Sequence, residues 1–185
     1  MRLATLLRYL YLSYFSKPAS ERVLYRAVRR TRAKKILEIG LASTDRTLRM
    51  IRLASSYAEP AEVQYAAIDL FESRPSTSAQ QISLKQAHRL LKQTPAKAQL
   101  IPGDASSALQ RAANALPNID LLLISSDHDE AAMQNAWFYV PRMLHARSVV
   151  YWETVDAETG ESTFRLLTLG EIQTRATAGR RRRAA

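Results

Sequence analysis

The sequence predicts an α/β protein with a doubly wound, mostly parallel sheet. Short apolar runs alternate with helical patterns along the chain, and turns that contain Pro, Gly or Asn separate many of these segments. The most apolar run, residues 119–124, lies well inside the series, as expected of a central parallel strand covered on both faces. These observations predict four strand–helix units, a fifth strand and a terminal β-hairpin, which makes seven strands.

The chain begins with an expected amphipathic helix, because Leu3, Leu6, Leu7, Leu10 and Tyr14 recur at helical spacing. A second helix is expected over residues 21–32, with Ser20 as its N-cap. The predicted strands then cover residues 35–40, 63–70, 98–101, 119–124 and 148–152. The helices between them are predicted over residues 44–57, 79–93, 104–116 and 130–143.

The last part of the chain holds two more strand-like runs, residues 164–168 and 172–177. Leu169-Gly170-Glu171 joins them, which favours a β-hairpin. With 185 residues the chain has the size of one domain. We therefore predict a basic N-terminal helical segment that packs on the domain (1–33), an α/β domain (34–178) and a disordered Arg-rich tail (179–185).

Basic charge gathers at the two ends of the chain. The net charge is +10, and residues 1–35 hold ten Lys or Arg and one acid, Glu21. The tail adds Arg180, Arg181, Arg182 and Arg183. Such ends are either solvated or bind nucleic acid or another anionic surface.

Several classes of protein are excluded. The absence of cysteine excludes disulfides, thiolate zinc sites and cysteine nucleophiles. The chain lacks a G-x-G-x-x-G fingerprint, a P-loop and a G-x-S-x-G elbow. Arg8 interrupts the first apolar run, so we expect no signal peptide or transmembrane segment, and a cytoplasmic location. The first helix then packs on the domain, or it contacts a second copy, as in a homodimer, or a membrane surface.

Polar residues follow the predicted strands. The first strand leads into Glu38-Ile39-Gly40-Leu41-Ala42 and the second ends in Asp69-Leu70. Pro102-Gly103-Asp104-Ala105 follows the third strand, and Ser125-Ser126-Asp127-His128 follows the fourth. An acid at the end of a second strand can accept hydrogen bonds from two ribose hydroxyls. Asp69 and Asp104 are otherwise explained as an exposed strand-end acid and a helix N-cap.

In their order, these motifs resemble those of the class I S-adenosylmethionine (SAM) dependent methyltransferases, which have a Rossmann-like fold. The fourth motif resembles the Ile-Asp-Gly-Asp-His stretch of an O-methyltransferase-like branch. Ala42 and Thr44 stand where glycine is usual, and Ser125 replaces an acid that can hold a metal, so no metal is expected. The resemblance implies a cofactor site of eight residues: Glu38, Gly40, Ala42, Asp69, Leu70, Asp104, Ala105 and Ser125.

The resemblance implies methyl transfer from SAM to an unknown acceptor, most simply a small molecule. His128 is the candidate general base because an imidazole titrates near neutral pH, and Asp127 would orient it. Otherwise Asp127 and Asp129 cap the next helix, and His128 lies exposed in the loop before it. The alternative function is a catalytically inactive, methyltransferase-like binding protein or subunit, tethered to an anionic partner by its basic ends.

Overall fold

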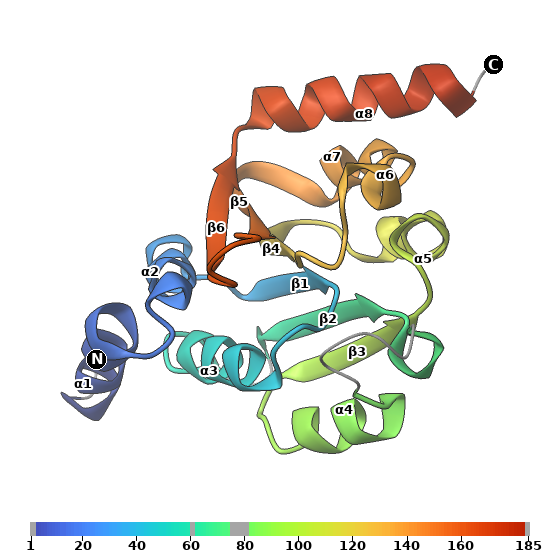
Figure 1. Cartoon of the computed structure of the whole chain (residues 1–185). Helices are drawn as coiled ribbons and strands as arrows, with labels where there is room; N and C mark the ends of the chain where they lie inside the picture. Colours follow the sequence, from blue (N-terminus) through green and yellow to red (C-terminus); the bar gives the residue numbers. More distant parts are fainter. Residues whose placement is uncertain (1–2, 60–61, 75–81, 184–185) are drawn as a thin grey trace.

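A computed structural model of the chain describes residues 3–59, 62–74 and 82–183. It has a six-stranded sheet with the order β3-β2-β1-β4-β5-β6 (Figure 1). The first five strands run parallel, and β6 pairs antiparallel with β5. The strands are β1 (Lys35–Ile39), β2 (Gln64–Asp69), β3 (Lys97–Pro102), β4 (Ile119–Ile124), β5 (Leu144–Val155) and β6 (Ser162–Leu167). The doubly wound α/β prediction is therefore confirmed, with six strands in place of seven.

Helices cover both faces of the sheet. The α-helices are α1 (Leu3–Leu10), α2 (Arg22–Thr31), α3 (Thr44–Ala54), α4 (Leu84–Leu91), α5 (Ala105–Ala112), α6 (Glu130–Met133), α7 (Val140–Met143) and α8 (Leu169–Arg183). The shorter helical turns are η1 (Tyr11–Phe15), η2 (Ala19–Glu21), η4 (Phe71–Ser73), η5 (Ala113–Ala115) and η6 (Ala136–Phe138). Helices α2 and α3 pack on one face, and α5 to α8 lie against the other (Figure 1).

Alternate residues of the strands serve the two faces, as the pleat requires. In β4, Leu121 and Leu123 join the core under α2 and α3, whereas Leu122 and Ile124 join the core under α5 to α8. Every residue of this strand except Asp120 is buried. The apolar run at residues 119–124 is therefore a central strand, as predicted.

The predicted terminal hairpin is wrong. Residues 162–167 form β6, but residues 169–183 form α8. Thr168 and Glu171 make a reciprocal capping box: the Thr168 N–H donates to Glu171 Oε2 at 2.8 Å, and the Glu171 N–H donates to Thr168 Oγ1 at 3.2 Å. Ile172 and Ala176, four residues apart, are both buried. The segment predicted as a strand is thus a helix that begins with a capping box and buries two residues on one side.

The C-terminal tail also departs from the prediction. Helix α8 continues through residues 179–183, which had been expected to be disordered, while residues 184–185 lie outside the described part of the chain. The start of the helix predicted at residue 79 lies outside it as well; within the described residues α4 begins after Ser83, whose side chain forms a capping box with Gln86.

At the N-terminus, Ser20 does not cap α2, because it lies inside the short turn η2. The N-terminal segment packs on the domain through η1, where Leu12 is buried in the core beside α2. None of the eight described residues of α1 is buried. Among the helices in the described ranges, none has the length and apolarity needed to cross a bilayer.

Candidate active site

A cavity of about 530 Å³ lies where the carboxyl ends of the central strands meet. Residues from the loops after β1, β2 and β4 contribute to it, together with β5, β6 and η2. The strand order changes direction between β1 and β4, and doubly wound folds bind ligands at this point. The lining residues used below are Ala42, Ser43, Arg46, Arg74, Asp127, Glu153 and Phe164.

Gly40 forms the turn at the end of β1, and no other residue type fits its position. Its φ is +85°, in the left-handed region that favours glycine. A Cβ at Gly40 would lie 2.6 Å from Ser125 Cβ and 3.0 Å from the His128 ring. The turns after β1 and β4 therefore touch, and the glycine predicted from the first motif is required by packing.

Asp69 ends β2 with its carboxylate turned toward the Gly40 turn. It is 1% exposed. Its Oδ2 accepts a hydrogen bond from the Leu41 N–H at 2.6 Å, and its Oδ1 accepts one from the Phe71 N–H at 2.6 Å. The side chain thus ties the loops after β1 and β2 together. The expected alternative, an exposed acid at a strand end, is wrong.

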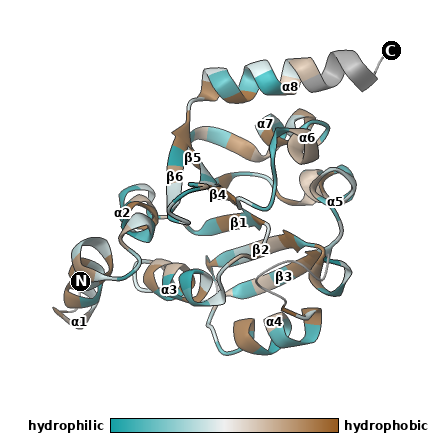
Figure 2. Ribbon diagram, viewed as in Figure 1, coloured by the Kyte–Doolittle hydropathy of each residue, from teal (hydrophilic) through white to brown (hydrophobic). Residues whose placement is uncertain are grey.

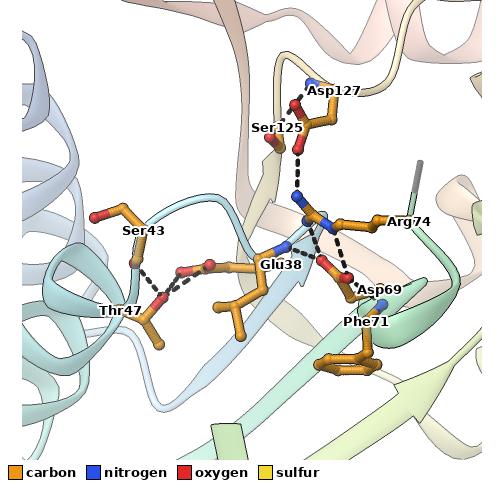
Figure 3. Close-up of polar contacts among 9 residues, drawn as sticks. Glu38, Ser43, Thr47, Asp69, Phe71, Arg74, Ser125 and Asp127 are labelled. Carbon is orange, nitrogen blue, oxygen red and sulfur yellow. Dashed lines mark hydrogen bonds and ion pairs between the residues drawn. The ribbon is translucent and has the colours of Figure 1, made fainter. Parts of the chain in front are cut away.

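Arg74 donates two further hydrogen bonds to the Asp69 carboxylate (Figure 3). Its Nε donates to Asp69 Oδ1 at 2.9 Å, and its Nη2 donates to Asp69 Oδ2. Its Nη1 donates to Asp127 Oδ2 at 2.8 Å. Asp69 now accepts four hydrogen bonds, about as many as a carboxylate can accept. A ribose could bond to Asp69 only if Arg74 moved away.

Asp127 and His128 lie in the loop after β4. A carboxylate that orients an imidazole would accept a hydrogen bond from it, and these two side chains form no such bond. Asp127 is paired with Arg74, and its own N–H donates to Ser125 Oγ at 3.4 Å. His128 packs against Gly40, and its Nδ1 is buried with no hydrogen-bond partner in the described part of the chain. Burial lowers the pKa of His128 below its ordinary value, so the neutral imidazole predominates at neutral pH.

Asp129, rather than Asp127, caps the helix that follows this loop, since its side chain accepts a hydrogen bond from the Ala132 N–H. Among the described residues, no hydrogen bond joins the Asp127 carboxylate to the His128 ring. The structure therefore does not support the prediction that Asp127 orients His128. Ser125 is fully buried and lies against Gly40, on the same side of the turn as the His128 ring. It is therefore a packing partner of the turn, at the position predicted for a cofactor contact.

Glu38 is buried in β1, before the Gly40 turn, and does not line the cavity. Its two carboxylate oxygens accept hydrogen bonds from Thr47 Oγ1 at 3.0 and 2.9 Å, so it anchors the first turn of α3 (Figure 3). The side chain is fully buried, and burial raises the pKa of Glu38 to about 7. Glu38 does not line the cavity, so its contact with a cofactor stays a prediction.

The remaining predicted residues lie around the same edge of the sheet. Ala42 lines the cavity. Leu70 precedes the turn η4, and Ala105 is buried in the first turn of α5. Asp104 caps α5: it accepts hydrogen bonds from the Ser107 N–H at 3.0 Å and from Ser107 Oγ, and these bonds lower its pKa. The helix-cap explanation of Asp104 is therefore confirmed, while its contact with a cofactor stays a prediction.

Arg46 and Glu153 form a buried ion pair at the wall of the cavity, which sequence reasoning did not anticipate. Arg46 Nη1 lies 3.0 Å from Glu153 Oε1, and the two side chains are 2% and 6% exposed. Arg46 Nε and Nη2 and Glu153 Oε2 have no hydrogen-bond partner in the described part of the chain. The guanidinium also lies over the ring of Phe164, 5.3 Å from its centroid. Three polar atoms of this pair are therefore buried beside the cavity without a hydrogen-bond partner among the described residues.

The only signals for these residues in the sequence were weak. Arg46 comes just after the residues that stand where glycine is usual, in the first turn of α3, and Glu153 follows the fifth strand as predicted over residues 148–152. Nothing in the sequence pointed to Arg74. A metal is not suggested by the geometry, since the described residues contain no group of three or more His, Asp or Glu side chains able to hold one.

No protein-family model and no curated protein matches the sequence. Solved structures do match the fold. An O-methyltransferase from Bacillus cereus in complex with S-adenosylhomocysteine (SAH) is similar with a TM-score of 0.54 and 15% identity, over 100% of this chain and 81% of that one. The O-methyltransferase TomG from Streptomyces achromogenes, in complex with SAM, is similar with a TM-score of 0.52 and 13% identity, over 100% and 80%.

The calicheamicin methyltransferase CalS11 is similar as well, with a TM-score of 0.52 and 16% identity over 80% of this chain and 76% of that one. The fold of this chain is therefore the class I methyltransferase fold that the sequence motifs predicted.

Proposed function

We propose that this protein is a SAM-dependent methyltransferase that acts on a small-molecule acceptor. The observation that carries the proposal is the placement of Asp69: a buried carboxylate at the end of β2, turned toward a glycine that tolerates no Cβ, where the strand order reverses. This is the position from which a carboxylate accepts hydrogen bonds from the two hydroxyls of a ribose.

The residues present fit an adenosine-containing cofactor on one condition. Ala42 lines the cavity, Gly40 lets the turns after β1 and β4 pack together at its edge, and Asp69 supplies the acceptor atoms. The condition is that Arg74 releases Asp69, because the four hydrogen bonds it now accepts exhaust its capacity. When bound, SAM supplies a methyl group carried on a positively charged sulfur.

The acceptor site in this proposal is the cavity beside the Gly40 turn. The free donors of Arg46 and the free oxygen of Glu153 would hold polar groups of the acceptor, and Phe164 supplies an apolar surface. Holding two reactants in line contributes more to methyl transfer than any single acid or base. His128 is proposed as the proton acceptor, since its lowered pKa keeps it neutral, although it does not line the cavity.

A second function is favoured by one observation. The Arg74–Asp69 ion pair fills the ribose position with the chain's own side chain. A protein in which this pair never opens would keep the fold without the cofactor, and would be the catalytically inactive binding protein or subunit that the sequence left open.

Calorimetric titration with SAH distinguishes the two functions. The methyltransferase proposal expects the wild-type protein to bind SAH and the Asp69→Ala variant to lose that binding. Asp129→Ala is a matched control, because Asp129 caps α6 and does not line the cavity. If neither the wild type nor an Arg74→Ala variant bound SAH, the proposal would be overturned in favour of the second function.

A further inference from the structure

The N-terminal helical segment, residues 3–15, exposes a continuous apolar stripe. Its members are spaced so that they share one side of the segment: Leu3, Leu7, Leu10, Tyr11, Tyr14 and Phe15. Leu3 is 72%, Leu7 58% and Phe15 71% exposed. The opposite side carries Leu12, which is buried. Figure 2 shows α1 at the edge of the molecule with apolar residues along it. Soluble proteins seldom expose such a stripe unless something binds there.

A cavity of about 380 Å³ adjoins this segment and is lined by cations and phenols. Its lining residues are Tyr9, Arg26, Arg29, Arg30, Arg32 and Tyr57. None of the four arginines forms an ion pair with an acid in the described part of the chain, and the lining contains no acid. Arg29 stacks on the ring of Tyr9, 4.0 Å from its centroid, which joins the cavity to α1.

Tyr57 supplies an independent sign of a ligand. Its hydroxyl is buried and has no hydrogen-bond partner among the described residues. A buried hydroxyl without a partner costs free energy unless a ligand satisfies it. Four guanidinium groups and a free phenol together suit a phosphate, which accepts several charge-assisted hydrogen bonds.

Tyr9 of α1 lines the cavity, so the cavity and the stripe border the same helical segment. Together they select one kind of partner. A nucleic acid would offer phosphates but no apolar surface for Leu3, Leu7 and Phe15. A second copy of the chain could cover the stripe. If the same surface of that copy were used, its cavity would place arginines against arginines, because the lining contains no acid. A bilayer of anionic phospholipids offers both a phosphate layer and an apolar layer beneath it, and tyrosines favour the boundary between them.

We propose that residues 3–15 and the arginine cavity form a docking surface for an anionic phospholipid membrane. The apolar stripe enters the boundary between headgroups and acyl chains, and the arginines with Tyr57 hold headgroup phosphates. The segment lies flat on the surface, because α1 and η1 are too short to span a bilayer. This inference does not depend on the proposed function.

The test is co-sedimentation of the full chain with vesicles of phosphatidylcholine alone or mixed with phosphatidylglycerol. We expect binding to the mixed vesicles only, weakened by salt. An Arg26→Gln/Arg30→Gln variant should bind on the order of 30-fold more weakly, since each cation near an anionic bilayer contributes about 1 kcal/mol. Leu7→Asn should also weaken binding, because it removes apolar area from the stripe.

Two matched controls use the same residue types elsewhere. Arg89→Gln changes an exposed arginine on α4, and Leu169→Asn changes an apolar residue of α8 that is 53% exposed; both should bind as the wild type does. Circular dichroism verifies that each variant is folded. The proposal is overturned if the folded wild type fails to bind mixed vesicles, or if the control variants bind as weakly as the test variants. It is also overturned if the protein does not bind vesicles but binds single-stranded RNA, or forms a dimer that Leu7→Asn disrupts.

Discussion

Arg74 and Asp69 form a two-point contact in which both nitrogens on one edge of the guanidinium meet both carboxylate oxygens, with Nε 2.9 Å from Oδ1. The arginine comes from the loop directly after the strand that Asp69 ends. The same guanidinium reaches Asp127 in the loop after β4. One side chain therefore closes the edge of the sheet at which the proposed function requires Asp69 to accept hydrogen bonds from a ribose.

Replacing Arg74 by Ala should strengthen the binding of SAH. Hydrogen bonds to charged groups contribute about 1.5–3 kcal/mol, so freeing Asp69 from this competitor is expected to raise the affinity by about tenfold or more. Calorimetry measures the change, and Arg89→Ala, on the exposed side of α4, should leave the affinity unaltered. A weaker affinity in Arg74→Ala would mean that Arg74 itself holds the ligand.

The Arg46–Glu153 pair should behave as a buried ion pair whose halves depend on each other. Arg46→Met alone, or Glu153→Leu alone, is expected to lower the free energy of unfolding by about 3–5 kcal/mol, because a buried charge loses its partner. The double variant should cost less than the sum of the two. Urea unfolding measures all three.

Lys34→Met is the control for this cycle, since the side chains of the Lys34–Glu62 pair are about half exposed and solvent screens the attraction between them, so its loss should change the stability little. Strict additivity of Arg46→Met and Glu153→Leu would show that the two side chains do not interact in solution.

Gly40→Ala should be far more damaging than Gly160→Ala. Both glycines have positive φ, so both substitutions carry a backbone cost of about 1–2 kcal/mol. Only at Gly40 would the new Cβ meet another atom, Ser125 Cβ, at 2.6 Å; at Gly160 nothing lies within 4 Å. The overpacking adds roughly 1–3 kcal/mol.

Thermal and urea unfolding of the two variants give this difference. Adding Ser125→Gly to Gly40→Ala should restore part of the stability, because it removes the atom that the new methyl group meets. If Gly40→Ala and Gly160→Ala proved equally stable, the contact between the turns after β1 and β4 would be refuted.

Glu38 should make the stability depend on pH in an unusual direction. Burial raises its pKa from 4.5 to about 7, so the folded protein binds this proton more tightly than the unfolded chain does. The contribution to the free energy of unfolding is therefore present below about pH 4.5 and is lost as the pH rises through about 7.

Glu38→Gln cannot titrate, and the wild type should lose on the order of 2–3 kcal/mol relative to it across that range. Urea unfolding of both proteins at about pH 5 and about pH 8 measures this difference, and comparing the two removes the contributions of His128 and other groups. Parallel pH profiles for the two proteins would mean that Glu38 is ionised throughout.

The places of the first five strands along the chain and the burial of β4 could be predicted, because both follow from local patterns. Apolar runs, turn residues and the Asp104 cap act over a few residues, so their signal lies within a short stretch of chain. The last helix was missed for the opposite reason: Thr168, Glu171, Ile172 and Ala176 form a capping box and a helical face, but the β-branched residues among them also suit a strand.

The candidate site was likewise predicted in part, because some of its features follow from local patterns and others do not. By itself the sequence determined which residues end the strands, and so placed Gly40, Asp69 and Asp127 at one edge of the sheet. Only the tertiary structure decided how they pair: Arg74 with Asp69 and Asp127, and Arg46 with Glu153, 107 residues away in the chain. Ion pairs between distant segments leave no periodic trace in a sequence, because their geometry exists only once the strands have assembled side by side.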